Sequence, residues 1–172
     1  MITFGLKCVE TGIGSFESKI RHGVYQGYSY AGMIHNTDFK KNYWSQWISN
    51  PLLCQSGWHC VLRNQIIRTE RFWSSKLSDF ENVNDPSSYL VQGNEIWVVA
   101  VRGENEIDTV KATYSQIRFV KVIAKTTATT FEYSHAKWLA HPEKLVALLD
   151  KTVAAIKSNP KKYGFEKEDE FV

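Results

Sequence analysis

Alternating apolar residues and short apolar runs along the chain predict strands. The predicted strands are Met1–Glu10, Ile20–Tyr30, Gly57–Leu62, Ile96–Val101, Ile107–Thr113 and Gln116–Lys125. Met1–Glu10 has apolar residues at its even positions, which is typical of a half-buried strand. Ile96–Val101 is almost continuously apolar, which indicates a strand buried on both faces. Glycine and acidic residues predict a turn at Gly103–Glu106.

A different spacing, with apolar residues three and four positions apart, predicts helices. The predicted helices are Asn64–Leu77, Phe131–Ala140 and Pro142–Asn159. Pro142 occupies a first-turn position that proline tolerates, and Pro160 ends the last helix. The polar and aromatic stretch His35–Pro51 is predicted as a long loop that contains a short helix.

These elements predict an α+β fold: a mixed or antiparallel sheet with a mid-chain helix and C-terminal helices packed on one face. The length of 172 residues suits one domain, which we place at residues 1–160, with a flexible charged tail at 161–172. No apolar run reaches the roughly 18 residues that span a bilayer, and the start lacks a signal-peptide pattern. An odd cysteine count is typical of a reducing compartment, so we expect a cytoplasmic protein that does not engage a membrane.

Composition adds two hints about function. Aromatic residues make up 13% of the chain, which indicates a large core or, less commonly, a surface that stacks flat ligands. The formal net charge of +3 is only a weak indication of nucleic-acid binding, since nucleic-acid binders usually carry a strongly basic face.

The most conspicuous group of chemically active side chains lies around the Gly57–Leu62 strand. Cys54, His59 and Cys60 lack both the usual zinc spacing and a second ligand pair, so no metal site is expected. A cysteine nucleophile would need His22 or His35 beside it, which a sequence cannot show. A buried, unreactive cysteine is the more common case.

Three segments in the middle of the chain carry a family resemblance. These are Cys54-Gln-Ser-Gly57-Trp58-His59-Cys60, then Ile96-Trp-Val-Val-Ala-Val-Arg-Gly103, and then Asp108–Ile117. In these segments the chain resembles an uncharacterised domain of bacteriophage proteins. That family pairs a Gly-Phe-His-x-Cys element with a later strand and glycine. The resemblance implies a small phage-type protein that works in the host cytoplasm.

A second resemblance is to the ADP-ribosyltransferase fold. Arg21-His22-Gly23 is similar to the strand end that grips NAD in that family, and Tyr114–Phe119 is similar to its terminal strand. The resemblance implies an NAD-binding core that modifies or inhibits a host factor. Whether the chain is an active enzyme stays open, because Trp58 or His59 stands where the family has tyrosine.

The same resemblance implies the roles of individual residues. His22 with the acidic residues Asp108 and Glu106 would be catalytic, because a carboxylate stabilises the positive charge that develops as the glycosidic bond breaks. The ligand-binding residues would be Gly23, Tyr25, Trp58 and His59. An aromatic wall of this kind would hold the cationic nicotinamide ring.

The alternative is a non-enzymatic protein that binds a host defence protein or nucleic acid. Cations interleaved with aromatic residues are typical of proteins that bind single strands. The candidate nucleic-acid contacts are Lys40, Lys41, Trp44, Arg68 and Arg71. A solvated helix face is the more common explanation for such arginines.

Overall fold

The computed structural model describes residues 1–11, 20–21, 24–25, 28–29, 42–53, 55–67, 95–109, 111–125 and 142–172. The strands are β1 (Thr3–Thr11), β2 (Ile20–Arg21), β3 (Val24–Tyr25), β4 (Tyr28–Ser29), β5 (Trp58–Leu62), β6 (Glu95–Ile107) and β7 (Ala112–Lys125). The helices are α1 (Arg63–Ile67), α3 (Pro142–Ser158) and the 3-10 turn η4 (Pro160–Tyr163). The fold is α+β, as the sequence predicts.

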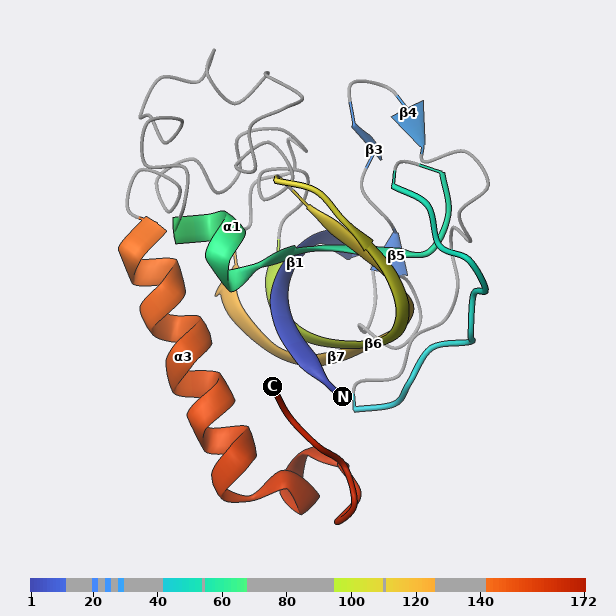
Figure 1. Ribbon diagram of the computed structural model, residues 1–172. Coiled ribbons are helices and arrows are strands. Elements are labelled where there is room, and N and C mark those ends of the chain that lie inside the picture. Colours follow the sequence, from blue (N-terminus) through green and yellow to red (C-terminus); the bar gives the residue numbers. More distant parts are fainter. Residues whose placement is uncertain are drawn as a thin grey trace.

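Four strands pair in a closed ring, which Figure 1 shows end-on. β1 pairs with β5 and β6, and β7 pairs with the same two strands, so each ring strand has two neighbours. Every one of these pairings is antiparallel. Gly5 allows β1 and β5 to approach closely, because a Cβ atom there would lie 2.7 Å from the carbonyl oxygen of Val61.

β6 and β7 form one long hairpin whose turn lies at residues 108–111. The amide of Asp108 donates to the carbonyl of Lys111 at 3.1 Å, and the Asp108 carboxylate accepts the Lys111 amide at 2.8 Å. The turn predicted at Gly103–Glu106 is therefore wrong, and the predicted strand Ile107–Thr113 spans the real turn. Gly103, with φ of +94°, lies instead in an irregularity of β6, where the register shifts.

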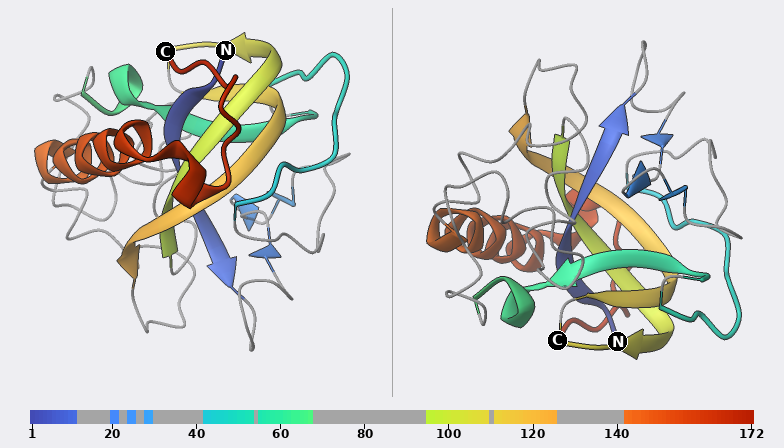
Figure 2. Two further views of the ribbon diagram at one scale, coloured as in Figure 1. Left: turned by 90° about the horizontal axis from the view of Figure 1, so that it is seen from below. Right: turned by 90° about the horizontal axis from the view of Figure 1, so that it is seen from above.

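The buried side chains form two clusters on the sheet. A strand cluster consists of residues from β5, β6 and β7: Trp58, Cys60, Leu62, Trp97, Val99, Val101, Ala112, Tyr114, Ile117 and Phe119. A second cluster joins the other sheet residues to α3 and to the C-terminal segment. The predicted helix Pro142–Asn159 is confirmed as α3, whose apolar face, including Leu145 and Leu149, packs against the ring. Figure 2 shows α3 along one side of the ring.

The C-terminal segment folds back onto the start of the chain, so the flexible tail predicted at 161–172 is wrong. The amide of Ile2 donates to Glu170, and the amide of Val172 donates to Ile2, at 2.8 and 2.9 Å. Phe165 is 2% exposed, and Phe171 stacks on Phe4 with ring centroids 5.6 Å apart. The many charged residues of this segment predict a solvated tail, but Phe165 and Phe171 pack against the start of the chain.

Other predictions differ from the structure or lie beyond its description. Ile20–Tyr30 is not one strand, because β3 pairs with β4 inside that range. The described part of His35–Pro51, residues 42–51, contains no helix. Only the beginning of Asn64–Leu77 is described, as α1, and Phe131–Ala140 lies outside the described residues. None of the helices that the structure describes has the length and apolar character needed to cross a bilayer.

Candidate functional site

Trp58 and His59, the aromatic wall expected for NAD, lie on β5 inside the protein. Trp58 is 1% exposed and His59 is 3% exposed. The indole Nε1 of Trp58 donates to the carbonyl of Gln46 at 3.1 Å, and its ring packs in the strand cluster. In this conformation neither side chain is open to a ligand, so stacking on a nicotinamide ring would require β5 to rearrange.

The surroundings of His59 keep its imidazole neutral. Burial, assisted by the nearby charges of Lys7 and Lys111, lowers the pKa of His59 to about 3, although a hydrogen bond with the Gly57 backbone opposes the shift. The Nζ of Lys7 donates to the backbone carbonyl of His59 at 2.7 Å. A base with so low a pKa is protonated only in strong acid and is poorly suited to proton transfer near pH 7.

The Cys60 thiol is held in its unreactive form. Cys60 is 4% exposed, and burial raises the pKa of its thiol to about 12, with a smaller opposing effect from Lys7. The thiolate is the nucleophilic form of cysteine, so this environment disfavours covalent catalysis. Within the described ranges no group of three or more His, Cys, Asp or Glu side chains is placed to hold a metal ion.

The two acidic candidates, Glu106 and Asp108, lie near the tip of the β6–β7 hairpin, where both are exposed. Glu106 accepts a hydrogen bond from the Leu53 amide at 3.4 Å, and Asp108 caps the turn. Glu106 pairs with Thr113, which in turn pairs with His59. Two strand spacings, about 10 Å, therefore separate the backbones of Glu106 and His59.

The remaining residues named for NAD cannot be placed beside this group. His22 and Gly23 lie outside the described residues, and only the backbone of Tyr25, in β3, is described. The described residues thus do not assemble the expected cleft, and binding of NAD stays a prediction. Lys40, Lys41, Arg68 and Arg71 also lie outside the described residues.

A different group of aromatic side chains comes together on residues 42–48, which run along β7. The amides of Asn42, Ser45 and Ile48 donate to carbonyls of β7, each at 2.9 Å. β5 pairs with β7 only as far as Tyr114, and this segment follows the same strand beyond that point. In Figure 2 it lies on the side of the ring away from α3.

Trp44 points toward two arginines that fix the segment in place. The Arg102 guanidinium carbon lies 3.9 Å from the Trp44 ring centre, and that of Arg118 lies 5.1 Å away. Arg118 also donates to the carbonyls of Asn42 and Gly164, at 2.5 and 3.2 Å. Burial lowers the pKa of Arg118, which is 6% exposed, although carboxylates including Asp169 oppose that shift. The predicted contact Trp44 is therefore a packing residue here.

Two aromatic rings of the same segment face solvent instead. Tyr43 is 64% exposed and Trp47 is 51% exposed. The Trp47 ring lies over Gly103, where a Cβ atom would come within 2.7 Å of Trp47 Cη2. Tyr43, Trp47 and the partly exposed Arg102 are here called the aromatic surface. The sequence indicates an aromatic and basic stretch at Lys40–Trp47, which includes both rings, but it does not indicate Arg102. The segment bonds to β7 at every third residue, through Asn42, Ser45 and Ile48, so neither the strand period nor the helix period of the sequence predicts which rings face solvent.

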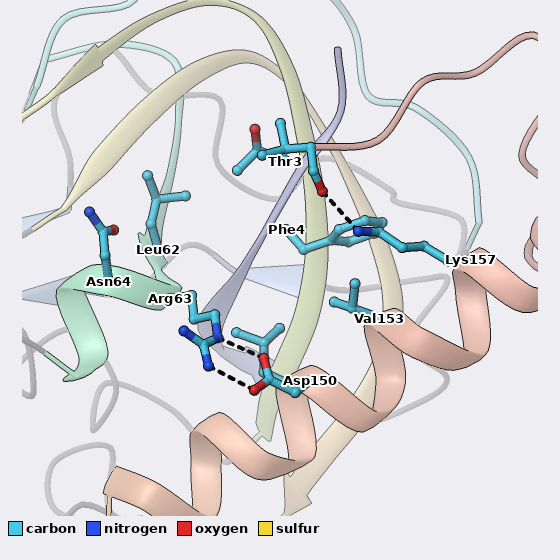
Figure 3. Close-up of a pocket in the computed structure, with 10 residues that line it drawn as sticks. Thr3, Phe4, Leu62, Arg63, Asn64, Asp150, Val153 and Lys157 are labelled. Carbon is cyan, nitrogen blue, oxygen red and sulfur yellow. Dashed lines mark hydrogen bonds and ion pairs between the residues drawn. The ribbon is translucent and has the colours of Figure 1, made fainter.

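A cavity of about 380 Å³ lies between α3 and the beginning of β1 and α1 (Figure 3). Phe4, Leu62, Leu149 and Val153 contribute apolar walls. Its cations already have protein partners: Arg63 forms a two-point ion pair with Asp150 at 2.7 and 2.9 Å, and Lys157 donates to the carbonyl of Val172 at 2.9 Å. With these groups committed, the cavity offers less to orient a ligand than the aromatic surface does.

Comparisons of the chain with protein-family models, with curated proteins and with solved structures found no match. Function is therefore inferred from the chemistry of the aromatic surface.

Proposed function

We propose that this chain is a non-enzymatic protein that binds single-stranded nucleic acid on its aromatic surface. The observation that carries the proposal is the pair of exposed rings, Tyr43 and Trp47, on a segment whose Trp44 ring lies 3.9 Å from the guanidinium of the partly exposed Arg102. Single-strand binders combine such rings, on which bases stack, with cations that attract the phosphates. The resemblance to phage domains would imply that this activity takes place in the cytoplasm of an infected cell.

The rigidity of residues 42–48 supports this use of the rings. Three backbone hydrogen bonds tie the segment to β7, and Trp44 packs against Arg102 and Arg118. Tyr43 and Trp47 therefore project from a fixed backbone. A rigid aromatic platform loses little conformational entropy when a base stacks on it, which favours binding.

Charge limits the strength expected of the interaction. The net charge is only +3. The acidic residue Glu104 also lies close to the aromatic surface, and its carboxylate accepts a hydrogen bond from the Asn50 amide at 3.5 Å. Few phosphates would be neutralised, so the affinity should depend only moderately on salt. We expect dissociation constants in about the micromolar range at low salt, set mainly by stacking.

Binding of NAD is the competing proposal, and a host protein partner is a third. The NAD proposal draws its support from the Arg21-His22-Gly23 resemblance, whereas the burial of Trp58 and His59 weighs against it. No contact among the described residues favours a particular protein partner.

Fluorescence polarisation with labelled 15-nucleotide oligo(dT) and oligo(U) tests the proposal. We expect the wild-type chain to bind, and Trp47→Ala to weaken binding about tenfold, because one stacked base contributes about 1–3 kcal/mol. Leu52→Ala is the matched control, since Leu52 is 44% exposed on the same loop but outside the aromatic surface. Unlabelled duplex DNA should compete poorly.

The proposal fails if the wild-type chain binds neither oligonucleotide at low salt, or if Trp47→Ala behaves like Leu52→Ala. A thermal-shift titration with NAD run in parallel separates the competitors. A rise in melting temperature with NAD, together with no oligonucleotide binding, would favour the ADP-ribosyltransferase-like function.

A further inference from the structure

Arg102 differs from the other described arginines in how its guanidinium is used. Arg63 commits two nitrogens to Asp150, and Arg118 donates to two backbone carbonyls. Arg102 donates only from Nε, to the side-chain oxygen of Gln116 at 2.8 Å. Within the described part of the chain, no hydrogen bond or ion pair is recorded for its Nη1 and Nη2.

The guanidinium of Arg102 is nevertheless held in one orientation. Its central carbon lies over the Trp44 ring, 3.9 Å from the ring centre. Its partner Gln116 is itself fixed, because the amide nitrogen of that side chain donates to the carbonyl of Ser45 at 2.7 Å. Stacking and the Nε bond together leave the two outer nitrogens as an oriented pair of donors. Such a fork matches two oxygens of a phosphate group.

Arg102 is adjacent in β6 to the residue that the Trp47 ring covers. The residue after Arg102 is Gly103, on which the Trp47 ring lies. Arg102 and the position that the Trp47 ring covers are therefore neighbours on one backbone, about 3.8 Å apart from Cα to Cα. A side chain at Gly103 would collide with the ring and separate the two features.

We infer that Arg102 binds a phosphate of the bound strand through Nη1 and Nη2. This inference rests on the proposed nucleic-acid function. It assigns separate tasks to the two residues: Trp47 supplies stacking, which salt hardly affects, and Arg102 supplies the salt-dependent contact.

The first test measures oligo(U) affinity over a range of salt concentrations. Arg102→Gln should reduce the slope of log K against log salt by about 0.7, the value for one phosphate of a single strand. Arg102→Lys should keep the slope but bind several-fold more weakly, because lysine lacks the fork. Trp47→Ala should weaken binding with the slope unchanged. Arg63→Gln, on the α3 side, is the control and should alter neither quantity.

An unchanged slope for Arg102→Gln would overturn the inference while leaving the proposed function standing.

A second measurement uses only the wild-type chain and so does not depend on whether a variant folds. In the wild-type chain, titration with inorganic pyrophosphate should shift the NMR signal of the Arg102 Nε–H group, which is fixed to Gln116. If oligonucleotides do not bind at all, the proposed function fails. The pyrophosphate titration then decides whether Arg102 is an anion site: a saturable shift supports the site, and the absence of a shift rejects it.

Discussion

Trp47 and Trp58 lie close together in the sequence but have opposite surroundings. Trp58 is 1% exposed in the middle of the sheet, whereas Trp47 is 51% exposed on a segment beside it. β5 has a paired strand on both edges and is buried at every position, while residues 42–48 line one edge of β7. The residue with the most conspicuous sequence context is therefore structural, and the inconspicuous one is available for binding.

The comparison also separates two uses of polar groups. Around β5, buried polar side chains such as His59 and Thr113 are held by backbone groups, and they support the ring. Around residues 42–48, the guanidinium of Arg102 lies over the Trp44 ring and its Nε donates to Gln116. The described residues leave its Nη1 and Nη2 atoms for other contacts. A functional group must be fixed yet still accessible, and only the second region meets both conditions.

The largest expected difference between the two regions concerns stability. Trp58→Ala should lower the free energy of unfolding by about 3–5 kcal/mol, because it leaves a large cavity in the strand cluster. Urea unfolding followed by circular dichroism measures the change. If the alanine variant does not fold, Trp58→Phe should still show a clear loss. A Trp58→Ala protein as stable as the wild type would contradict the assignment of β5 to the core.

The second prediction uses pH to probe β5. His59 has a pKa of about 3 when folded against 6.5 when exposed, so the unfolded chain binds more protons between these values. Stability should therefore fall as the pH drops below about 6.5, by up to about 1.4 kcal/mol per pH unit from this residue.

Chemical denaturation at pH 7 and pH 5 measures this effect, with His59→Gln as the matched variant, because glutamine can still donate to the Gly57 backbone but does not titrate. The variant should lose less stability than the wild type over that interval. Parallel losses in the two proteins would show that His59 is not buried in its neutral form.

The smallest expected effect on stability is that of Trp47→Ala. Its ring is half exposed, so its removal should change the free energy of unfolding by no more than about 1 kcal/mol. Urea unfolding of this variant beside Trp58→Ala measures the contrast directly. A loss as large as that of Trp58→Ala would mean that the Trp47 ring on Gly103 is part of the core rather than a binding platform.

Local sequence patterns predicted those parts of the fold that local forces determine. Gly57–Leu62 and Pro142–Asn159 were recognised because their apolar spacing matches the element that they form. The predicted turn at Gly103–Glu106 is wrong because glycine and acidic residues are typical of turns, whereas here a register shift accommodates them inside β6. The C-terminal segment was misread because its order depends on Phe165 and Phe171 meeting Phe4 at the other end of the chain.

The candidate site was harder to predict than the fold. The resemblances directed attention to Trp58 and His59, whose burial depends on strand pairing that no local pattern reveals. Arg102 became a candidate only through its contacts with Trp44 and Gln116, which come from separate segments. The aromatic character of residues 42–48 was visible in the sequence, but not which rings would point outward.

Closure of the ring has a consequence for how the protein folds during synthesis. β1 leaves the ribosome first, yet one of its partners is β6, where Thr3 pairs with Val101. At about 5–20 residues per second, that partner follows roughly 5–20 s later. During this interval the edge of β1 that pairs with β6 has no partner, and an unpaired strand edge can pair with other chains. A translating cell would therefore need to shield β1, and high expression should favour aggregation before the ring can close.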